Sequence, residues 1–258
     1  MANYEKYRVK VLEKAFLLLA QFKEVGISLS VKDLSESLGY NKTSTLRLIR
    51  NLEEFAYLER VEGTQRYKLG FGIYCLGQLA ESYEFIRKVA RPFLNELCDL
   101  CEETVHLAVL KNGQALYIDK IESQNKALRI ISAVGTSLPC HSSGLGKVLL
   151  SALDDDQLDR VIEEWGFQKF TENTIVDESR LLEELTKIRE QGYGTDNEEI
   201  EYGLKCVAAP IFDKQGKVVA AVSVSGPKER MDHNFDMYIQ AVKKAAWHIS
   251  ENLVVPSN

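Results

Sequence analysis

The chain has 258 residues, of which 45% are hydrophobic and 27% charged, and its 32 Lys and Arg against 38 Asp and Glu give a net charge of −6. These proportions are typical of globular proteins, and the length suits one or two domains. Because no run of 18 apolar residues occurs and the first ten residues, MANYEKYRVK, hold no apolar segment, we expect neither a membrane span nor secretion. The five Cys residues are irregularly spaced, so we expect reduced thiols and a cytoplasmic protein.

The charge is distributed unevenly along the chain. Residues 1–68 carry 12 Lys and Arg against 9 Asp and Glu, a net charge of +3, whereas the remainder carries 20 against 29, a net charge of −9. A mildly basic N-terminal part joined to an acidic body permits contact with nucleic acid at one end of the chain only.

The first 55 residues predict three helices. Residues 8–22 place apolar side chains at helical spacing over a broad face. A second helix is expected to begin after Ser30, a good N-cap residue, and to end at Gly39, a residue type typical of helix C-termini. Asn41 can cap a third helix over residues 42–55.

The next segment predicts a hairpin and a connecting helix. Residues 57–61 and 65–69 are short strand-like runs around EGTQ. Residues 71–89 have a helical pattern and are expected to link the two parts of the chain.

The third helix has two different stripes. Its core-facing stripe at helical spacing consists of Thr45, Leu48, Ile49 and Leu52. Its start and opposite stripe consist of Lys42, Thr43, Ser44, Leu46, Arg47 and Arg50. After a short helix and a turn, such a helix fits the recognition helix of a helix-turn-helix, and a hairpin with Arg60, Arg66 and Lys68 fits a wing that contacts the DNA backbone. The alternative is a three-helix bundle whose basic face is merely solvated.

The rest of the chain interleaves helices and strands, which predicts an α+β sheet domain. An amphipathic helix is expected to begin near Pro92. Strands are expected at 105–110, 115–120, 128–133, 205–212 and 217–225. Helices are expected at 143–152, 155–165, 178–190 and 232–253.

The stretch LPCHSSGLGKVLL, residues 138–150, resembles several kinds of chemical site. A phosphate loop would need Gly where His141 stands and a hydroxyl residue where Val148 stands, so that interpretation fails. Cys140 and His141 are adjacent, so on extended backbone they point to opposite sides and make a poor nucleophile–base pair. A zinc site from Cys140, His141, His106 and Cys206 lacks the usual Cys-x₂-Cys pairing.

Two further interpretations apply to the cysteines and glycines. Cys98 and Cys101 have redox spacing but lie within an expected helix, where two buried thiols on one face are the simpler explanation. Ser142 or Ser143 can cap the helix that follows Gly144 and Gly146, so that exposed backbone N–H groups could hold a small carboxylate without catalysis. The alternative is a tight glycine turn that lets a helix start against a sheet.

Residues 28–70 resemble the winged helix-turn-helix of the IclR family of bacterial transcription regulators. The family's recognition helix runs Lys-Ser-Thr-x-x-Arg-Leu, matched by Lys42-Thr43-Ser44-Thr45-Leu46-Arg47-Leu48, and its wing ends in Tyr-x-Leu-Gly, matched by residues 67–70. Leu46 stands where relatives more often have a polar or aromatic residue, and we expect it to contact a thymine methyl.

Residues 135–153 and 192–227 resemble the family's effector domain, so the resemblance covers nearly the whole chain. It implies a GAF-like fold that holds a small organic acid. Carried over by motif, the effector-binding residues are Gly144, Leu145, Asp196, Cys206, Ser223 and Ser225. Ser143, at the start of the helix beside these glycines, is counted with them as a seventh. Ser223 and Ser225 alternate with valines, so their hydroxyls share one face of a strand. Asp196 would repel a carboxylate unless it bonds to a ligand hydroxyl or to water, and DNEE could instead be a solvated acidic loop.

The sequence therefore predicts an effector-responsive transcription regulator rather than an enzyme, and a repressor of a catabolic operon. We expect a winged helix-turn-helix over 1–70, a linker helix over 71–89 and a GAF-like effector domain over 90–258. Its expected partners are double-stranded operator DNA, a small carboxylate and a second copy of itself, with a dimer of dimers as a further arrangement. No cofactor, metal or membrane partner is expected. The alternative is a Cys-dependent enzyme, or a redox or metal sensor, on a GAF-like body.

Overall fold

The computed structural model of the chain describes residues 8–22, 26–79, 83–123 and 133–253. The chain divides into two compact units, residues 1–82 and 83–258, which are described separately below. Among the described residues, no helix is long and apolar enough to span a membrane.

The first unit contains the three predicted helices, α1 (Lys10–Leu19), α2 (Val31–Leu38) and α3 (Lys42–Glu54). Ser30 caps α2 in a capping box with Asp33, and the left-handed Gly39 ends that helix. Asn41 caps α3 by accepting a hydrogen bond from the Ser44 N–H. The three expected capping residues are therefore confirmed.

A three-stranded antiparallel sheet completes the first unit, in the order β1-β3-β2. β2 (Leu58–Arg60) and β3 (Arg66–Leu69) form the predicted hairpin, and the two-residue β1 (Leu29–Ser30), which was not predicted, pairs with β3. A small core joins helices and sheet. It consists of Leu18, Phe22, Leu34, Ile49, Leu52, Leu58 and Tyr67.

Within residues 71–89, for which one linker helix was expected, the described residues belong to two helices. α4 (Phe71–Leu79) and α5 (Glu84–Cys101) are separate, and residues 80–82 between them lie outside the described residues. The prediction that a helix begins near Pro92 was wrong, because α5 runs through this proline. Proline inside a helix costs about 3 kcal/mol, and here the buried residues Ala90 and Leu94 on either side hold the helix in the core.

The second unit is built on a six-stranded antiparallel sheet in the order β6-β5-β4-β9-β8-β7. The strands are β4 (Thr104–Lys111), β5 (Gln114–Ile121), β6 (Ser137–Pro139), β7 (Gly194–Asn197), β8 (Leu204–Phe212) and β9 (Val218–Pro227). β4 and β5 turn at Asn112 and Gly113, both at positive φ, a combination typical of tight hairpins. β6 and β7 were not predicted, and most of the strand expected at 128–133 lies outside the described residues.

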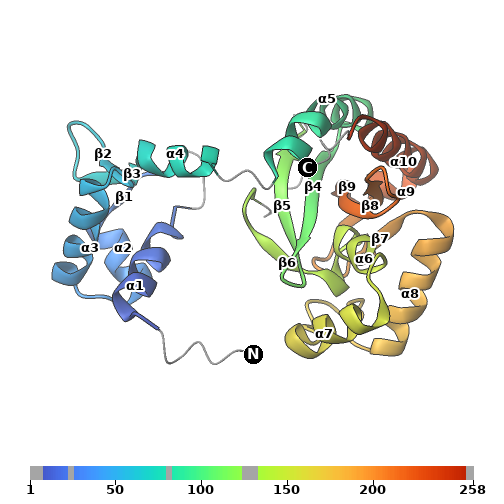
Figure 1. Ribbon diagram of the computed structural model, residues 1–258, viewed down its shortest axis with the longest axis horizontal. Coiled ribbons are helices and arrows are strands. Elements are labelled where there is room, and N and C mark those ends of the chain that lie inside the picture. The colour runs from blue at the N-terminus through green and yellow to red at the C-terminus, as the bar shows by residue number, and fades with distance from the viewer. Residues whose placement is uncertain (1–7, 23–25, 80–82, 124–132, 254–258) are drawn as a thin grey trace. The chain divides into compact units, whose positions relative to one another are not determined.

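Helices cover both faces of this sheet (Figure 1). α5 and α10 (Phe235–Asn252) pack on one face, and α6 (Gly144–Leu150), α7 (Asp155–Trp165) and α8 (Glu178–Gln191) lie on the other. The C-terminal helix expected at 232–253 is α10, and the short α9 (Lys228–His233) precedes it. Strand residues alternate between the two cores, so each strand position belongs either to the α10 side or to the α6 side.

Candidate functional site

The outer stripe of α3 is a polar and basic surface. Lys42, Thr43, Arg47 and Arg50 are exposed, and Leu46 is 38% exposed. Ser44 is half-buried, with its backbone N–H bonded to the capping residue of the helix. The opposite stripe is buried through Thr45, Ile49 and Leu52, and Leu48 is half-buried. The structure therefore places the predicted DNA-facing residues together on the face of α3 that points away from its core.

Arg66 differs from the α3 residues because its guanidinium is bonded within the protein. Its Nη2 donates to the Ser28 carbonyl at 2.6 Å and lies 3.3 Å from the Asp33 carboxylate. Asp33 has a lowered pKa, mainly because the Ser30 N–H donates to it and Arg66 lies nearby. Arg66 thus ties the wing to the start of α2, and its side chain is still 46% exposed toward solvent.

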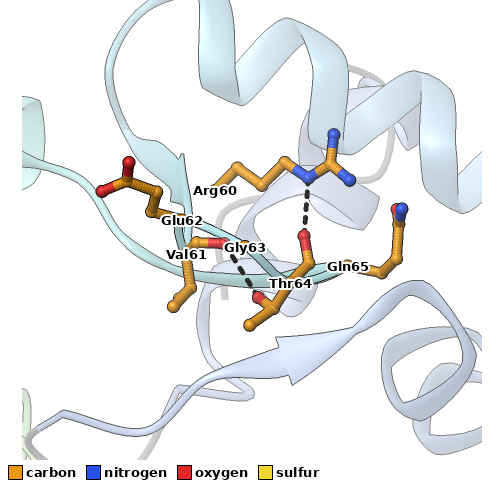
Figure 2. A pocket seen from close by; sticks show the side chains of 6 residues that line it. All are labelled: Arg60, Val61, Glu62, Gly63, Thr64 and Gln65. Atoms are coloured by element: carbon orange, nitrogen blue, oxygen red, sulfur yellow. Dashed lines mark hydrogen bonds between the residues drawn. The ribbon is translucent and has the colours of Figure 1, made fainter.

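The tip of the β2–β3 hairpin is an ordered turn (Figure 2). The Arg60 Nε donates to the Thr64 carbonyl at 2.9 Å, and the Thr64 hydroxyl donates to the Val61 carbonyl at 2.8 Å. Gly63 at positive φ permits the reversal. Arg60 and Gln65 are exposed here beside the acidic Glu62, so the tip of the wing offers a guanidinium and an amide for contacts with the DNA backbone.

The second unit contains a cavity of about 220 Å³ between its sheet and α6. Six of the seven predicted effector-binding residues line it: Ser143, Leu145, Asp196, Cys206, Ser223 and Ser225. Its other lining residues are His106, Tyr117, Leu138, Ile200, Glu201 and Leu204. The segments that supply these residues are far apart in sequence.

Strand register explains why these side chains meet. Cys206 on β8 is opposite Ser225 on β9, and Ser223 is opposite His106 on β4. Opposed residues of antiparallel strands point to the same face. The neighbouring positions Val207, Val222 and Val224 belong to the core on the α10 face, so the polar residues of these strands face α6 and the cavity.

The glycines of the α6 turn are required by close packing. A Cβ on Gly144 would lie 2.7 Å from the Cys206 Sγ, and one on Gly146 would lie 2.4 Å from the Cys140 backbone. Ser143 caps α6 by accepting a hydrogen bond from the Gly146 N–H at 3.0 Å. The Gly144 N–H faces the Cys206 sulfur. The N–H of Leu145, a residue that lines the cavity, belongs to the first turn of α6, where amides have no acceptor within the helix.

Burial controls the protonation of the lining groups. Desolvation raises the pKa of Asp196 to about 7, although the Glu199 N–H donates to its Oδ1 at 2.7 Å and partly opposes this shift. Burial raises the pKa of Cys206 to about 12 and lowers the pKa of His106 to about 3. The thiol is therefore protonated and the imidazole neutral near pH 7, whereas Asp196 is divided between its two forms.

The Cys-His pair lies outside the cavity lining. Cys140 is buried in the core on the α6 face, and desolvation raises the pKa of its thiol. The His141 Nε2 lies 2.9 Å from the Gln168 carbonyl, and its ring packs edge-on against Phe167. In the described part of the chain, no group of three or more His, Cys, Asp or Glu side chains has the arrangement of a metal site.

Two further cysteines lie in α5. Cys98 and Cys101 are both buried, and desolvation raises the pKa of each thiol, for Cys101 to about 12. The interpretation of this pair as buried thiols on one helix face is confirmed.

Several cavity residues were not predicted. Tyr117 and Leu138 lie on β5 and β6, where only alternation with core residues marks them. Ile200 and Glu201 lie in the connection between β7 and β8, inside the stretch that resembles the family's effector domain, but neither was carried over as a binding residue. His106 was considered only as a zinc ligand, and its cavity-facing position follows from the register between β4 and β9.

Comparison with known proteins agrees with this architecture. Residues 11–62 match the IclR helix-turn-helix domain, and residues 80–251 match the bacterial transcriptional regulator IclR C-terminal domain. The HTH-type transcriptional repressor AllR of Escherichia coli K12 is 35% identical over 247 residues, covering 95% of this chain and 90% of that protein.

Two solved structures share the fold over nearly the whole chain. The Thermotoga maritima IclR structure is 30% identical, with a TM-score of 0.79, and covers 96% of this chain and 100% of that one. An IclR homologue from Microbacterium hydrocarbonoxydans, solved in complex with 4-hydroxybenzoate, is 21% identical, with a TM-score of 0.79, over 94% of this chain and 98% of that one. The chain belongs to the IclR family of bacterial transcriptional regulators.

Proposed function

We propose that the chain is a repressor that binds operator DNA through α3 and its wing and releases it when a small carboxylate occupies the cavity of the second unit. The observation that carries the effector part is the cavity of about 220 Å³ lined by Ser143, Asp196, Cys206, Ser223 and Ser225. Ligand sites for drug-sized molecules are usually about 300–1,000 Å³, so this cavity suits a smaller molecule.

The lining chemistry supports an acid as the ligand. The Ser223 and Ser225 hydroxyls and the N–H of Leu145 can donate to a carboxylate, and hydrogen bonds to charged acceptors are about twice as strong as neutral ones. Protonated Asp196 can donate as well. Leu138, Ile200 and Leu204 give the cavity an apolar side for the rest of the molecule. The homologue of the same fold that was solved with 4-hydroxybenzoate, a small acid, supports this choice of ligand class.

A thermal-shift screen of the full chain tests acid binding. The panel contains small mono- and dicarboxylates, sugar acids and aromatic acids, and each is compared with its amide at equal concentration. An acid present at 100 times its Kd stabilises the folded state by about 2.7 kcal/mol, so its midpoint should rise by several degrees. Ser223→Ala/Ser225→Ala should abolish that rise. If no acid shifts the midpoint, or if acid and amide act equally, carboxylate sensing is wrong.

A second candidate function, a Cys-dependent enzyme, is opposed by the protonation of its thiols. A nucleophilic cysteine needs a pKa lowered toward neutrality, whereas burial raises the pKa of Cys206 to about 12. Cys140 is also protonated, and its neighbour His141 is directed to the Gln168 carbonyl. The family consists of transcriptional regulators, and we infer that the chain has no catalytic activity of its own.

We infer in addition that the chain acts as a homodimer through its first unit. α1 exposes a stripe at helical spacing, Val9, Leu12 and Phe16, which are 52%, 54% and 67% exposed. Phe71 and Tyr74 on α4 are similarly exposed and stacked. Clusters of large exposed apolar side chains are unusual on monomers and are typical of interaction surfaces. A dimer would also present two recognition helices to a two-fold symmetric operator.

Substitution of this stripe tests the dimer. Leu12→Asp/Phe16→Asp should give a monomer by sedimentation velocity, because a dimer would bury two new charges from each protomer. Leu182→Asp, at a 40% exposed position on α8, is the matched control and should leave the sedimentation coefficient unchanged. A wild-type chain that sediments as a monomer at micromolar concentration would contradict the inference, as would an L12D/F16D variant that remains dimeric.

A further inference from the structure

Lys147 is a fully buried lysine on α6, one turn beyond the residues that line the cavity. Its side chain is 1% exposed, and its Nζ lies 2.6 Å from the Glu199 Oε1 and 3.6 Å from the Glu184 Oε1. A buried ammonium requires a paired carboxylate, because an isolated buried charge is strongly unfavourable. The position of α6 therefore constrains where Glu199 can lie.

Glu199 belongs to the segment that forms one wall of the cavity. This segment, residues 196–201, runs from Asp196 at the end of β7 into the connection to β8. The Glu199 N–H donates to the Asp196 Oδ1 at 2.7 Å, and Glu198 stands at φ 60°. Ile200 and Glu201, the next two residues, line the cavity. A fixed position of Glu199 therefore also restricts three residues that line the cavity: Asp196, which precedes it, and Ile200 and Glu201, which follow it.

Two threonine hydroxyls also bind the backbone of the same segment. The Thr171 hydroxyl donates to the Glu198 carbonyl at 2.6 Å, and the Thr174 hydroxyl donates to the Glu199 carbonyl at 2.6 Å. These bonds hold backbone carbonyls, whereas the Glu199 carboxylate accepts from the Lys147 Nζ at 2.6 Å and from the Asn197 N–H at 3.4 Å. The lysine is thus a side-chain contact between this wall and α6, in addition to the close packing of Gly144 against the Asp196 backbone, and the first turn of α6 supplies Ser143 and Leu145 to the lining.

We propose that Lys147 is a positioning residue for effector binding: through its ion pair with Glu199 it sets the distance between the α6 turn and the 196–201 wall of the cavity. The proposal rests on the proposed function, because it assigns a role within the same effector site. A buried ion pair often adds little stability compared with apolar residues of the same volume, whereas it can fix one arrangement among several. The expected effect of the pair is therefore on the geometry of the wall more than on folding.

The test separates geometry from stability with three variants of the full chain. Lys147→Met leaves the buried Glu199 without its cation, whereas Glu184, the other carboxylate near Lys147, is 23% exposed and can be solvated. The variant should therefore have a lower thermal midpoint. Lys147→Met/Glu199→Met removes both charges and should recover most of the midpoint. Arg91→Met is the matched control, because Arg91 pairs at 2.5 Å with the buried Asp119, at a site formed by α5 and β5.

Two measurements are made on each variant: hydrogen exchange of the amides of residues 196–201, the Glu199 N–H in particular, and the Kd of the panel acid that most stabilises the wild type. In the folded K147M/E199M variant, we expect exchange at least tenfold faster in this segment and acid binding at least tenfold weaker, whereas R91M changes neither. Unchanged exchange would overturn the proposal, and so would faster exchange with an unchanged Kd. If no panel acid binds the wild type, the proposed function fails, and the exchange measurement still decides whether Lys147 holds the wall.

Discussion

Replacing Arg47 and Arg50 together by alanine is expected to weaken operator binding by on the order of 100-fold, since each bidentate arginine–base contact contributes about 1–3 kcal/mol and each lost phosphate contact weakens binding further. Both side chains are exposed on the outer face of α3, whose buried face stays intact in the variant. The measurement is fluorescence anisotropy on a duplex selected by the wild-type protein from random DNA, at several salt concentrations. The slope of log K against log salt should fall by about one for each phosphate that an arginine no longer neutralises.

A matched control removes the same charge from the other unit. Lys187 and Lys244 are exposed on α8 and α10, and Lys187→Ala/Lys244→Ala should leave both affinity and salt slope within about twofold of wild type. If the R47A/R50A variant keeps its affinity and its salt slope, α3 is not the recognition helix. A loss of similar size in the control would instead show that binding follows net charge and not this surface.

Acid binding is expected to depend on pH through Asp196. Burial raises its pKa to about 7, so the neutral carboxyl, which can donate to an anionic ligand, predominates below that pH. Above it the ionised Asp196 repels the ligand, and affinity should fall about tenfold per pH unit, or about 100-fold between pH 6 and pH 9. His106, with a pKa near 3, and Cys206, with a pKa near 12, keep their charge over this range.

The groups around Asp196 allow a specific control. Glu199, three residues after Asp196, forms an ion pair with Lys147. Tyr117 also lines the cavity, and burial raises its pKa. Asp196→Asn keeps the shape and the donor but cannot ionise, so its Kd, measured by calorimetry from pH 6 to pH 9, should be nearly constant and close to the wild-type value at pH 6. A wild-type Kd that does not change with pH, or an unchanged pH profile in D196N, contradicts this role.

Local signals predicted most elements of the fold correctly. The caps at Ser30 and Asn41, the left-handed Gly39 and the Asn112-Gly113 turn each act within a few residues, so sequence alone locates them. The elements that were not predicted depend on tertiary contacts. β7 has the sequence GTDN, which shows no apolar alternation, so no local signal marks it as a strand. Its backbone pairing with β8 forms it. α5 passes through Pro92 because the surrounding core outweighs the local penalty.

Some residues of the candidate site could likewise be predicted from local patterns, whereas the positions of others depend on tertiary contacts. Alternation along β9 predicts that Ser223 and Ser225 share a face, and the register with β8 and β4 then brings Cys206 and His106 beside them. No local pattern could show that Arg66 bonds to the Ser28 carbonyl, 38 residues earlier. The same holds for Lys147, which belonged to the rejected phosphate-loop pattern and instead pairs with Glu199, 52 residues later.

In the proposed function, an acid bound among Ser223, Ser225 and Asp196 in the second unit weakens DNA binding by α3 in the first. The most direct measurement is the operator Kd of the full chain at fixed pH and salt, with and without the acid identified by the screen, in wild type and in S223A/S225A. Coupling of about 1–3 kcal/mol predicts that the acid raises the operator Kd by roughly 5- to 150-fold in wild type and leaves it unchanged in the variant. An operator Kd that the bound acid does not alter, or an equal change in the variant, would contradict the account.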